Sequence, residues 1–343
     1  MDSMTPYPPL VRAPLRMRGI FGIAWQLYKR GFWQLFLVSL LLVGLPVLLM
    51  MLPYFSMINM VLPDIQSEFA QFGQLSDFST GAGFQQVGAM LGSMLLVCLV
   101  GLVWGFLFMP MYQGAVYLEM EERMEGRAGT LGQIFRYALP IGLKRFYTTF
   151  LAQYVLQMGF GLVVSVIYTF GVFGMVFSAI SSFRDLENGA LPTPFLITFG
   201  IVIALIFLLA LIFYTFIALI YPVATHEKKF AFAAIGRTFK LTIRHFWRIL
   251  GATLLCSLVV GLLSWILCLP ALLLWQNVEA MFVLLVVLSA VGSAFTAPYA
   301  AAFRTALYVD IAARVDGPEY SVIDPDTVPD PDPDELRDGP RTL

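Results

Sequence analysis

The sequence predicts an all-α fold: a polytopic membrane helix bundle with six transmembrane helices in three parallel hairpin repeats, accompanied by interfacial amphipathic helices. Of the 343 residues, 59% are apolar and 13% are charged, whereas soluble domains average about 45–50% and about 25%. The mean hydropathy is +0.80. The net charge of −1 provides no basic field that could attract nucleic acid. Composition therefore excludes a water-soluble enzyme and a nucleic-acid-binding protein.

Six stretches are long and apolar enough to span a membrane, which takes about 20 residues. They cover 32–53, 87–112, 146–180, 193–222, 246–274 and 280–303. The third stretch is about ten residues longer than a bilayer requires. We therefore expect it to tilt, to bend at Gly171 or Gly174, or to continue beyond the membrane.

A short amphipathic stretch precedes each odd-numbered span, at 20–30, 131–145 and 232–245. Each stretch ends in basic residues that lead into an aromatic pair: Lys29-Arg30-Gly31-Phe32-Trp33, Lys144-Arg145-Phe146-Tyr147 and Arg244-His245-Phe246-Trp247. Trp and Tyr favour headgroup depth, and Lys and Arg bind anionic lipid there. The pattern predicts three interfacial helices that contact the bilayer and its anionic lipid headgroups.

The basic residues define the orientation, because 20 of the 21 Lys and Arg residues fall on one side of the six spans and only Arg184 falls on the other. The positive-inside rule then predicts a multi-pass protein of the bacterial cytoplasmic (inner) membrane with both termini in the cytoplasm. The chain divides into a Pro-rich cytoplasmic arm (1–17), a membrane domain (18–317) and an acidic, disordered cytoplasmic tail (318–343).

The membrane domain contains an internal repeat, with units at about 18–127, 128–231 and 232–317. Each even-numbered span ends near the cytoplasmic interface in a proline, which kinks a helix and frees a carbonyl; these are Pro110, Pro222 and Pro298. A ten-residue string follows the first and third of them, at 117–126 and 308–317. The two copies share the residues Tyr117, Glu119, Arg123 and Glu125, aligned on Tyr308, Asp310, Arg314 and Asp316. The middle repeat has His226-Glu227-Lys228-Lys229 instead.

The repeated string allows two interpretations. Each acid lies four residues before its arginine, the order that stabilises an exposed helix by about 0.2–0.5 kcal/mol, and Gly126 and Gly317 then serve as C-caps. In this interpretation the string only ends a helix. Alternatively, its charged residues form a docking face for a cytoplasmic or membrane protein partner.

The chemistry-bearing residues predict no catalytic, cofactor or metal site. His226 and His245 lie nineteen residues apart and lack the spacing of a helical zinc pair. Cys98, Cys256 and Cys268 fall inside spans as packing residues. The one polar cluster is Gln153, Tyr154 and Gln157 in the third span. Its side chains either bond to neighbouring helices or line a substrate path.

The aromatic-led elbows, the Pro-terminated even spans and the segment from Tyr221-Pro222 to Phe246-Trp247 resemble a bacterial six-span family. That family includes the membrane domain of some glycerophosphoryl diester phosphodiesterases and small stand-alone relatives. The resemblance covers about residues 18–317 and implies the architecture and a link to lipid metabolism. It does not carry the activity, because the sequence has no catalytic barrel.

Together these features predict a non-enzymatic inner-membrane protein, a scaffold or accessory factor in envelope or lipid homeostasis. The alternative is a transporter or permease for a small or lipophilic solute, with its pathway between the repeats.

Overall fold

The computed structural model describes residues 14–51, 81–126, 131–137, 146–181, 193–274 and 276–317, and within these ranges the regular structure is helical. The predicted disordered tail at 318–343 and most of the Pro-rich arm lie outside the described residues. The helices, with η marking π-helical turns, are α1 Met17–Lys29, α2 Phe32–Ser39, η1 Leu40–Gly44, α4 Gly81–Val103, η2 Trp104–Phe108, α5 Met109–Met124, α6 Leu131–Tyr137, α7 Tyr147–Ser181, α9 Thr193–Ile217, α10 Ile220–His226, α11 Phe232–Leu272 and α12 Val278–Val315.

Six helical segments are long and apolar enough to cross a membrane. They are Phe32–Met51, Met94–Met124, Tyr147–Phe177, Leu196–His226, Phe232–Leu272 and Ala280–Val315. The prediction of an all-α membrane bundle with six spanning helices is therefore confirmed. The arrangement of these spans as three whole repeats stays a prediction.

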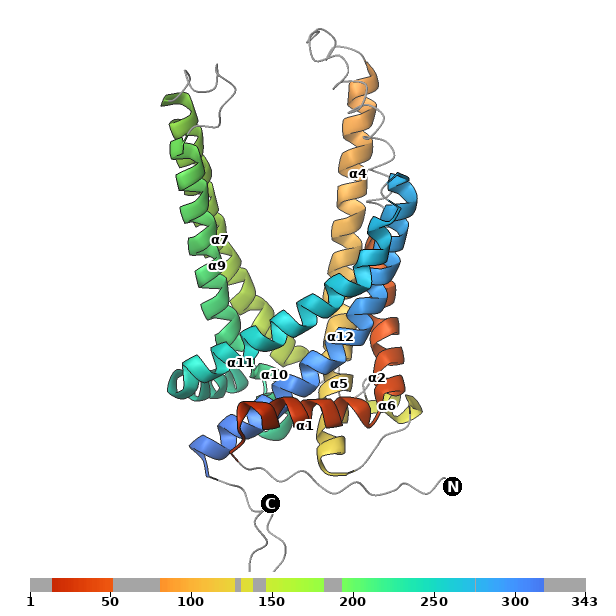
Figure 1. Cartoon of the computed structure of the whole chain (residues 1–343), viewed down its shortest axis with the longest axis vertical. Coiled ribbons are helices and arrows are strands. Elements are labelled where there is room, and N and C mark those ends of the chain that lie inside the picture. The colour runs from red at the N-terminus through yellow and green to blue at the C-terminus, as the bar shows by residue number, and fades with distance from the viewer. Residues whose placement is uncertain are drawn as a thin grey trace, which may run out of the picture.

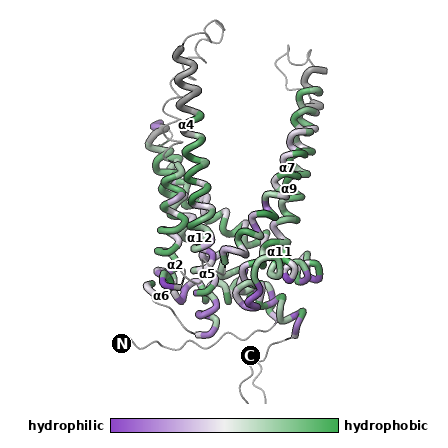
Figure 2. The backbone as a smooth tube through the Cα atoms, turned by 180° about the vertical axis from the view of Figure 1, so that it is seen from behind, coloured by the Kyte–Doolittle hydropathy of each residue, from purple (hydrophilic) through white to green (hydrophobic). Residues whose placement is uncertain are grey.

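The molecule consists of a base and two diverging arms (Figure 1). Helix α1 lies across the base, together with α5, α6, α10 and the C-terminal part of α12. Helices α7 and α9 form one arm, while α4 rises on the other side beside α2 and the paired upper parts of α11 and α12. Helix α11 contacts both α9 and α12 and so joins the two sides. Hydrophilic residues gather at the base, and the arms are mostly hydrophobic (Figure 2).

The elbows lie where the sequence places them. Helix α1 ends at Lys29, and α2 begins at Phe32 after Gly31, whose backbone is non-helical. Helix α11 bends at His245, which has φ −131° and ψ 32°. The interfacial helix and the span are therefore one bent helix in the third case and two helices in the first. The middle elbow lies partly outside the described residues.

The prolines act on the helices in different ways. A π-helical turn lies just before Pro110, at Trp104–Phe108, and an equivalent one precedes Pro46, at Leu40–Gly44. Since proline lacks an N–H and crowds the carbonyl one turn back, a wider turn accommodates it. The helical structure is interrupted between α9 and α10, at Ala218 and Leu219. Pro222 lies in the first turn of α10.

Helices α7 and α12 are both long. Helix α7 runs for 35 residues without a break, and Gly171 serves close packing, because a Cβ there would lie 2.7 Å from the side chain of Val202 on α9. Helix α12 continues through Pro298 to Val315. The helix therefore extends beyond the apolar stretch that was expected to end at Phe303, and Arg304 belongs to this helix.

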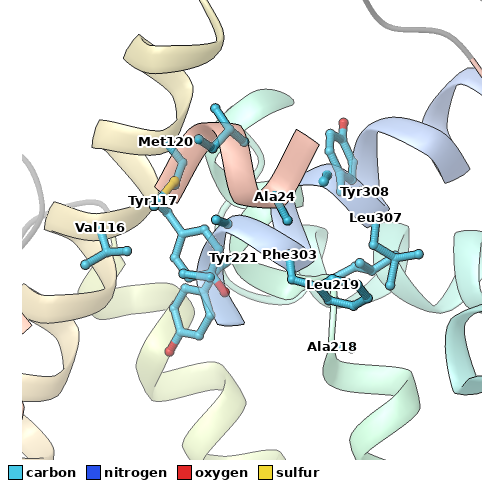
Figure 3. Packing of buried hydrophobic residues seen from close by; sticks show 14 of the residues in the cluster. Ala24, Val116, Tyr117, Met120, Ala218, Leu219, Tyr221, Phe303, Leu307 and Tyr308 are labelled. Atoms are coloured by element: carbon cyan, nitrogen blue, oxygen red, sulfur yellow. The ribbon is translucent and has the colours of Figure 1, made fainter. Parts of the chain in front are cut away.

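The buried core lies in the base rather than in the arms. It contains side chains of α1, α5, α10, α11 and α12. Figure 3 shows Tyr117 of α5 and Tyr221 of α10 lying close together in this cluster. Their rings stack with centroids 5.4 Å apart. The base is thus the packed part of the molecule, where polar side chains are held in fixed positions.

Candidate functional site

The first copy of the repeated string holds the C-terminal end of α1. Arg123 pairs with Glu119 at 2.8 Å, and the two side chains are 1% and 3% exposed. The Arg123 guanidinium also donates to the Leu27 carbonyl at 3.3 Å and to Oε1 of Gln34 at 3.2 Å. Leu27 carries one of the last four carbonyls of α1, which have no partner within the helix. Arg123 therefore caps α1 with a positive charge at the negative end of its dipole.

The second copy holds the other end of the same helix. The fully buried carboxylate of Asp310 accepts hydrogen bonds from Nε of Arg314 at 2.9 Å, from Nε of Arg248 at 2.7 Å and from the backbone N–H of Leu15 at 2.7 Å. The Arg314 and Arg248 guanidinium groups both donate to the Leu15 carbonyl, at 2.8 and 2.6 Å. Both polar groups of the Leu15 peptide are thus bound just before α1 begins.

The two copies have the same local structure. In each, the arginine bonds to the acid four residues before it. Helix α5 ends at Met124 and α12 at the aligned Val315, and two residues later Gly126 and Gly317 have positive φ values of 81° and 91°. The expected pairing and glycine caps are therefore present. Glu119 and Arg123 are buried, however, so the exposed-helix value of about 0.2–0.5 kcal/mol does not apply to that pair.

In the structure, the charged residues of both strings contact α1 and neighbouring helices of the same chain. The acidic residues that close them, Glu125 and Asp316, are exposed, and Asp316 pairs with Arg237 of α11. Docking of a separate protein on these residues stays a prediction.

The middle repeat supplies a third hydrogen-bonded carboxylate in the base, after those of Glu119 and Asp310. Glu227, just after α10, accepts hydrogen bonds from Nζ of Lys229 at 2.7 Å, from Nε of Arg237 at 2.8 Å and from the Tyr308 hydroxyl at 3.2 Å. Burial raises the pKa of Glu227, but the hydrogen bonds and positive charges of Lys229 and Arg237 outweigh it and leave the pKa below its ordinary value.

Helix α10 lies between the two repeat tyrosines. Tyr117 stacks on Tyr221 near the start of α10, and Tyr308 stacks on His226 at its end, with centroids 5.2 Å apart. This contact gives His226 an aromatic partner, while His245 lies at the bend of α11. Within the described ranges no three His, Cys, Asp or Glu side chains are grouped to hold a metal ion.

Arg304 lies in α12, one residue beyond the sixth apolar stretch, and was not among the predicted site residues. Its electrostatic partners are the Tyr117 hydroxyl first, then the Cys256 thiol and the Tyr221 hydroxyl. One signal could have found it: Arg304 is the only Asp, Glu, Lys or Arg between residues 280 and 309. An ionisable residue isolated in an apolar run is a functional candidate.

The intramembrane polar cluster lies at the foot of the α7 arm. Gln153, Tyr154 and Gln157 are all half-buried, and Tyr154 packs edge-on against Phe106 of η2, with centroids 4.9 Å apart. The side-chain carbonyl of Gln153 is buried and accepts no hydrogen bond from the described part of the chain. Whether the glutamines line a substrate path stays a prediction.

An apolar cavity of about 210 Å³ lies between α1, α11 and α12. Its lining includes Trp25, Tyr28, Val260, Leu263 and Tyr299. The hydroxyl of Tyr28 donates to the Phe295 carbonyl at 2.9 Å, so the aromatic wall is fixed in place. A cavity of this size and lining fits a short apolar chain.

Comparison with protein-family models, with curated proteins and with solved structures found no match for this chain. The resemblance to the phosphodiesterase membrane domain therefore stays a prediction. What the chain does has to be argued from its own geometry.

Proposed function

We propose that this integral membrane protein is a non-enzymatic scaffold of the bacterial inner membrane, an accessory factor in envelope or lipid homeostasis. In this proposal the base faces the cytoplasm and the arms lie in the bilayer. The lipid link follows the family resemblance of the sequence.

The observation that carries the proposal is the apolar surface of the arms. Beyond the base, α4 and the α7/α9 pair diverge (Figures 1 and 2). Large side chains such as Leu95, Leu162, Phe173 and Phe177 are exposed. Apolar faces of this extent need lipid or the helices of another membrane protein to cover them. The arms thus present an extended apolar surface to the membrane.

The arrangement of charges supports the orientation. The hydrophilic residues gather at the base, whereas the arms are mostly hydrophobic (Figure 2). Leu15 is hydrogen-bonded to Arg314, so the two ends of the membrane domain lie on the same side. The positive-inside rule assigns that side to the cytoplasm.

The scaffold proposal is tested in a strain that lacks the gene, by lipid composition and resistance to detergent. Wild-type protein is expected to restore both. A Phe173→Ala/Phe177→Ala variant, which changes only exposed arm surface, is expected to insert normally and fail to restore them. Phe232→Ala, which changes an exposed side chain at the start of α11 and outside the arms, is the matched control. Full complementation by the arm variant would contradict the proposal.

The second candidate function is transport of a small or lipophilic solute. The unpartnered carbonyl of Gln153 favours it, since a polar atom at the foot of an apolar arm can bind a passing solute. Proteoliposomes containing fluorescent phosphatidylglycerol test it through the rate at which dithionite bleaches the inner leaflet. A scaffold leaves this rate at that of protein-free vesicles. Acceleration that is lost in Gln153→Leu would establish transport instead.

A further inference from the structure

Arg304 differs from the other arginines held in the base. Arg123 binds Glu119, Arg237 binds Glu227, and Arg248 binds Asp310, each at 2.7–2.8 Å. Arg304 has no carboxylate within ion-pair distance in the described chain; its partners are hydroxyl and thiol groups. A guanidinium is always charged, and a charge in a packed interior is costly unless an opposite charge accompanies it.

The Tyr117 hydroxyl is the second observation. Tyr117 is 1% exposed, and its buried hydroxyl has no acceptor among the described residues, since the group beside it, the Arg304 guanidinium, can only donate. Since it is also the first electrostatic neighbour of Arg304, an unsatisfied donor and an unpaired cation lie together. Buried hydroxyl groups are nearly always hydrogen-bonded. Both deficits are removed at once by one anionic group that accepts from the guanidinium and from the hydroxyl.

The position of the pair is favourable for a ligand. Tyr117 belongs to α5, which continues one arm, and Tyr221 belongs to α10, which follows the other. The two rings lie close together where the arms join (Figure 3). Arg304 is only partly buried, so part of its side chain can be reached from outside the protein, while the Tyr117 hydroxyl beside it is buried.

We propose that Arg304 and the Tyr117 hydroxyl bind the phosphate of an anionic membrane lipid. Arginine and hydroxyl donors are the groups that recognise phosphate oxygens. The apolar arms above the site match acyl chains and offer nothing to a free anion, which favours a lipid over inorganic phosphate. This inference deepens the proposed function, because it names the lipid chemistry on which the scaffold role rests.

The test measures binding of dihexanoyl phosphatidylglycerol to the full-length protein, purified and delipidated in an uncharged detergent, by the shift in melting temperature. Wild type is expected to be stabilised in a saturable way. Arg304→Gln should weaken the apparent affinity about tenfold or more, as expected for loss of a charge-assisted hydrogen bond. Tyr117→Phe, which keeps the stacked ring, should weaken it several-fold.

Two controls separate this site from general effects. Lys240→Gln removes one exposed positive charge from the base, and Tyr28→Phe removes a buried hydroxyl whose partner lies within the chain. Both are expected to bind the lipid as wild type does. If Arg304→Gln does not fold, Tyr117→Phe decides alone, since its ring contacts are unchanged.

Equal affinity of wild type and Tyr117→Phe would overturn the proposal, as would the absence of any lipid-dependent shift in wild type. A shift produced equally by inorganic phosphate, or by dihexanoyl glycerol that lacks the phosphate, would overturn the assignment to a lipid phosphate. Lost lipid binding in Arg304→Gln with an intact cell phenotype would separate this site from the scaffold role. An arm variant that binds lipid but fails in the cell would separate them in the other direction.

Discussion

The guanidinium of Arg123 lies 3.3 Å from the backbone carbonyl of Leu27, 96 residues earlier in the chain. This contact joins the exit of the second span to the interfacial helix that precedes the first. Asp310 and Arg314 form the corresponding contacts at the other end of α1, through Leu15. The two copies of one sequence string therefore hold one helix between them, and this arrangement predicts the effect of several substitutions.

Arg123→Ala is expected to destabilise the protein by about 3–5 kcal/mol, because it leaves the buried carboxylate of Glu119 without its partner. Arg314→Ala should cost less than about 1 kcal/mol, since Asp310 keeps Arg248 and the Leu15 N–H. Unfolding by SDS in mixed micelles measures both. Equal, small losses for the two variants would show that the Arg123 pair is not buried.

Gly31→Ala should destabilise the base, because a Cβ at this position would overlap the Arg123 guanidinium. We expect a loss of about 1–3 kcal/mol, the usual effect of overpacking. Gly22→Ala is the matched control on α1, where a Cβ meets nothing within 4 Å and better helix propensity should stabilise by up to about 1 kcal/mol. The same unfolding assay compares them, and a neutral Gly31→Ala would contradict the packing at this elbow.

Glu227 should make stability depend on pH under acidic conditions. Its pKa in the folded protein lies below the ordinary value of 4.5, so the carboxylate stabilises the fold fully above that value. The contribution is lost as the pH falls through the lowered folded pKa. Melting temperatures from pH 7 down to pH 3 should fall less steeply for Glu227→Gln. Equal pH dependence of the melting temperature in Glu227→Gln and wild type would contradict a role of Glu227 in acid stability.

The α7/α9 arm should be sensitive to a single methyl group. Gly171→Ala places a Cβ 2.7 Å from Val202 and should destabilise the pair by about 1–3 kcal/mol. Val202→Ala in the same chain should restore most of the loss. Gly161→Ala, with nothing within 4 Å, is the control. A double-mutant cycle without coupling energy would mean that the helices do not meet at this point.

The charge asymmetry predicts the topology. Reporters fused after Gln74 and Asp185 should read as periplasmic, and those after Gly129 and Lys229 as cytoplasmic, because 20 of 21 basic residues lie on the second side. Alkaline phosphatase and green fluorescent protein activities give the readout. A cytoplasmic signal at Gln74 would contradict the six-span arrangement.

Local patterns predicted the local structure. The six spans follow from apolar length, the elbow at His245 from the basic–aromatic pattern, and the helix ends at Gly126 and Gly317 from the glycine itself. Each depends on a few neighbouring residues and on the membrane. The π-turn before Pro46 depends on the same proline chemistry as the one before Pro110, and proline position within a span was the available signal.

Burial in the base could not be predicted in this way. The spacing of Glu119 and Arg123 indicates that they pair. Their burial, however, depends on α1, which precedes Arg123 by about a hundred residues in the sequence. Arg304 was placed just outside the last span, because the apolar stretch was taken to end at Phe303. A proline removes only one hydrogen bond, and neighbouring helices compensate for it, so α12 continues past Pro298 and carries Arg304 to the edge of the core.

The contacts that the two repeated strings make at the ends of α1 also fix the order in which they can form. Leu15 is synthesised 295 residues before Asp310, the carboxylate that binds its N–H. A ribosome therefore inserts every span before the last contact to the first helix can form. A chain truncated before Asp310 leaves this end of α1 open. An interrupted copy therefore differs from a finished one in the contacts that hold the start of its first helix.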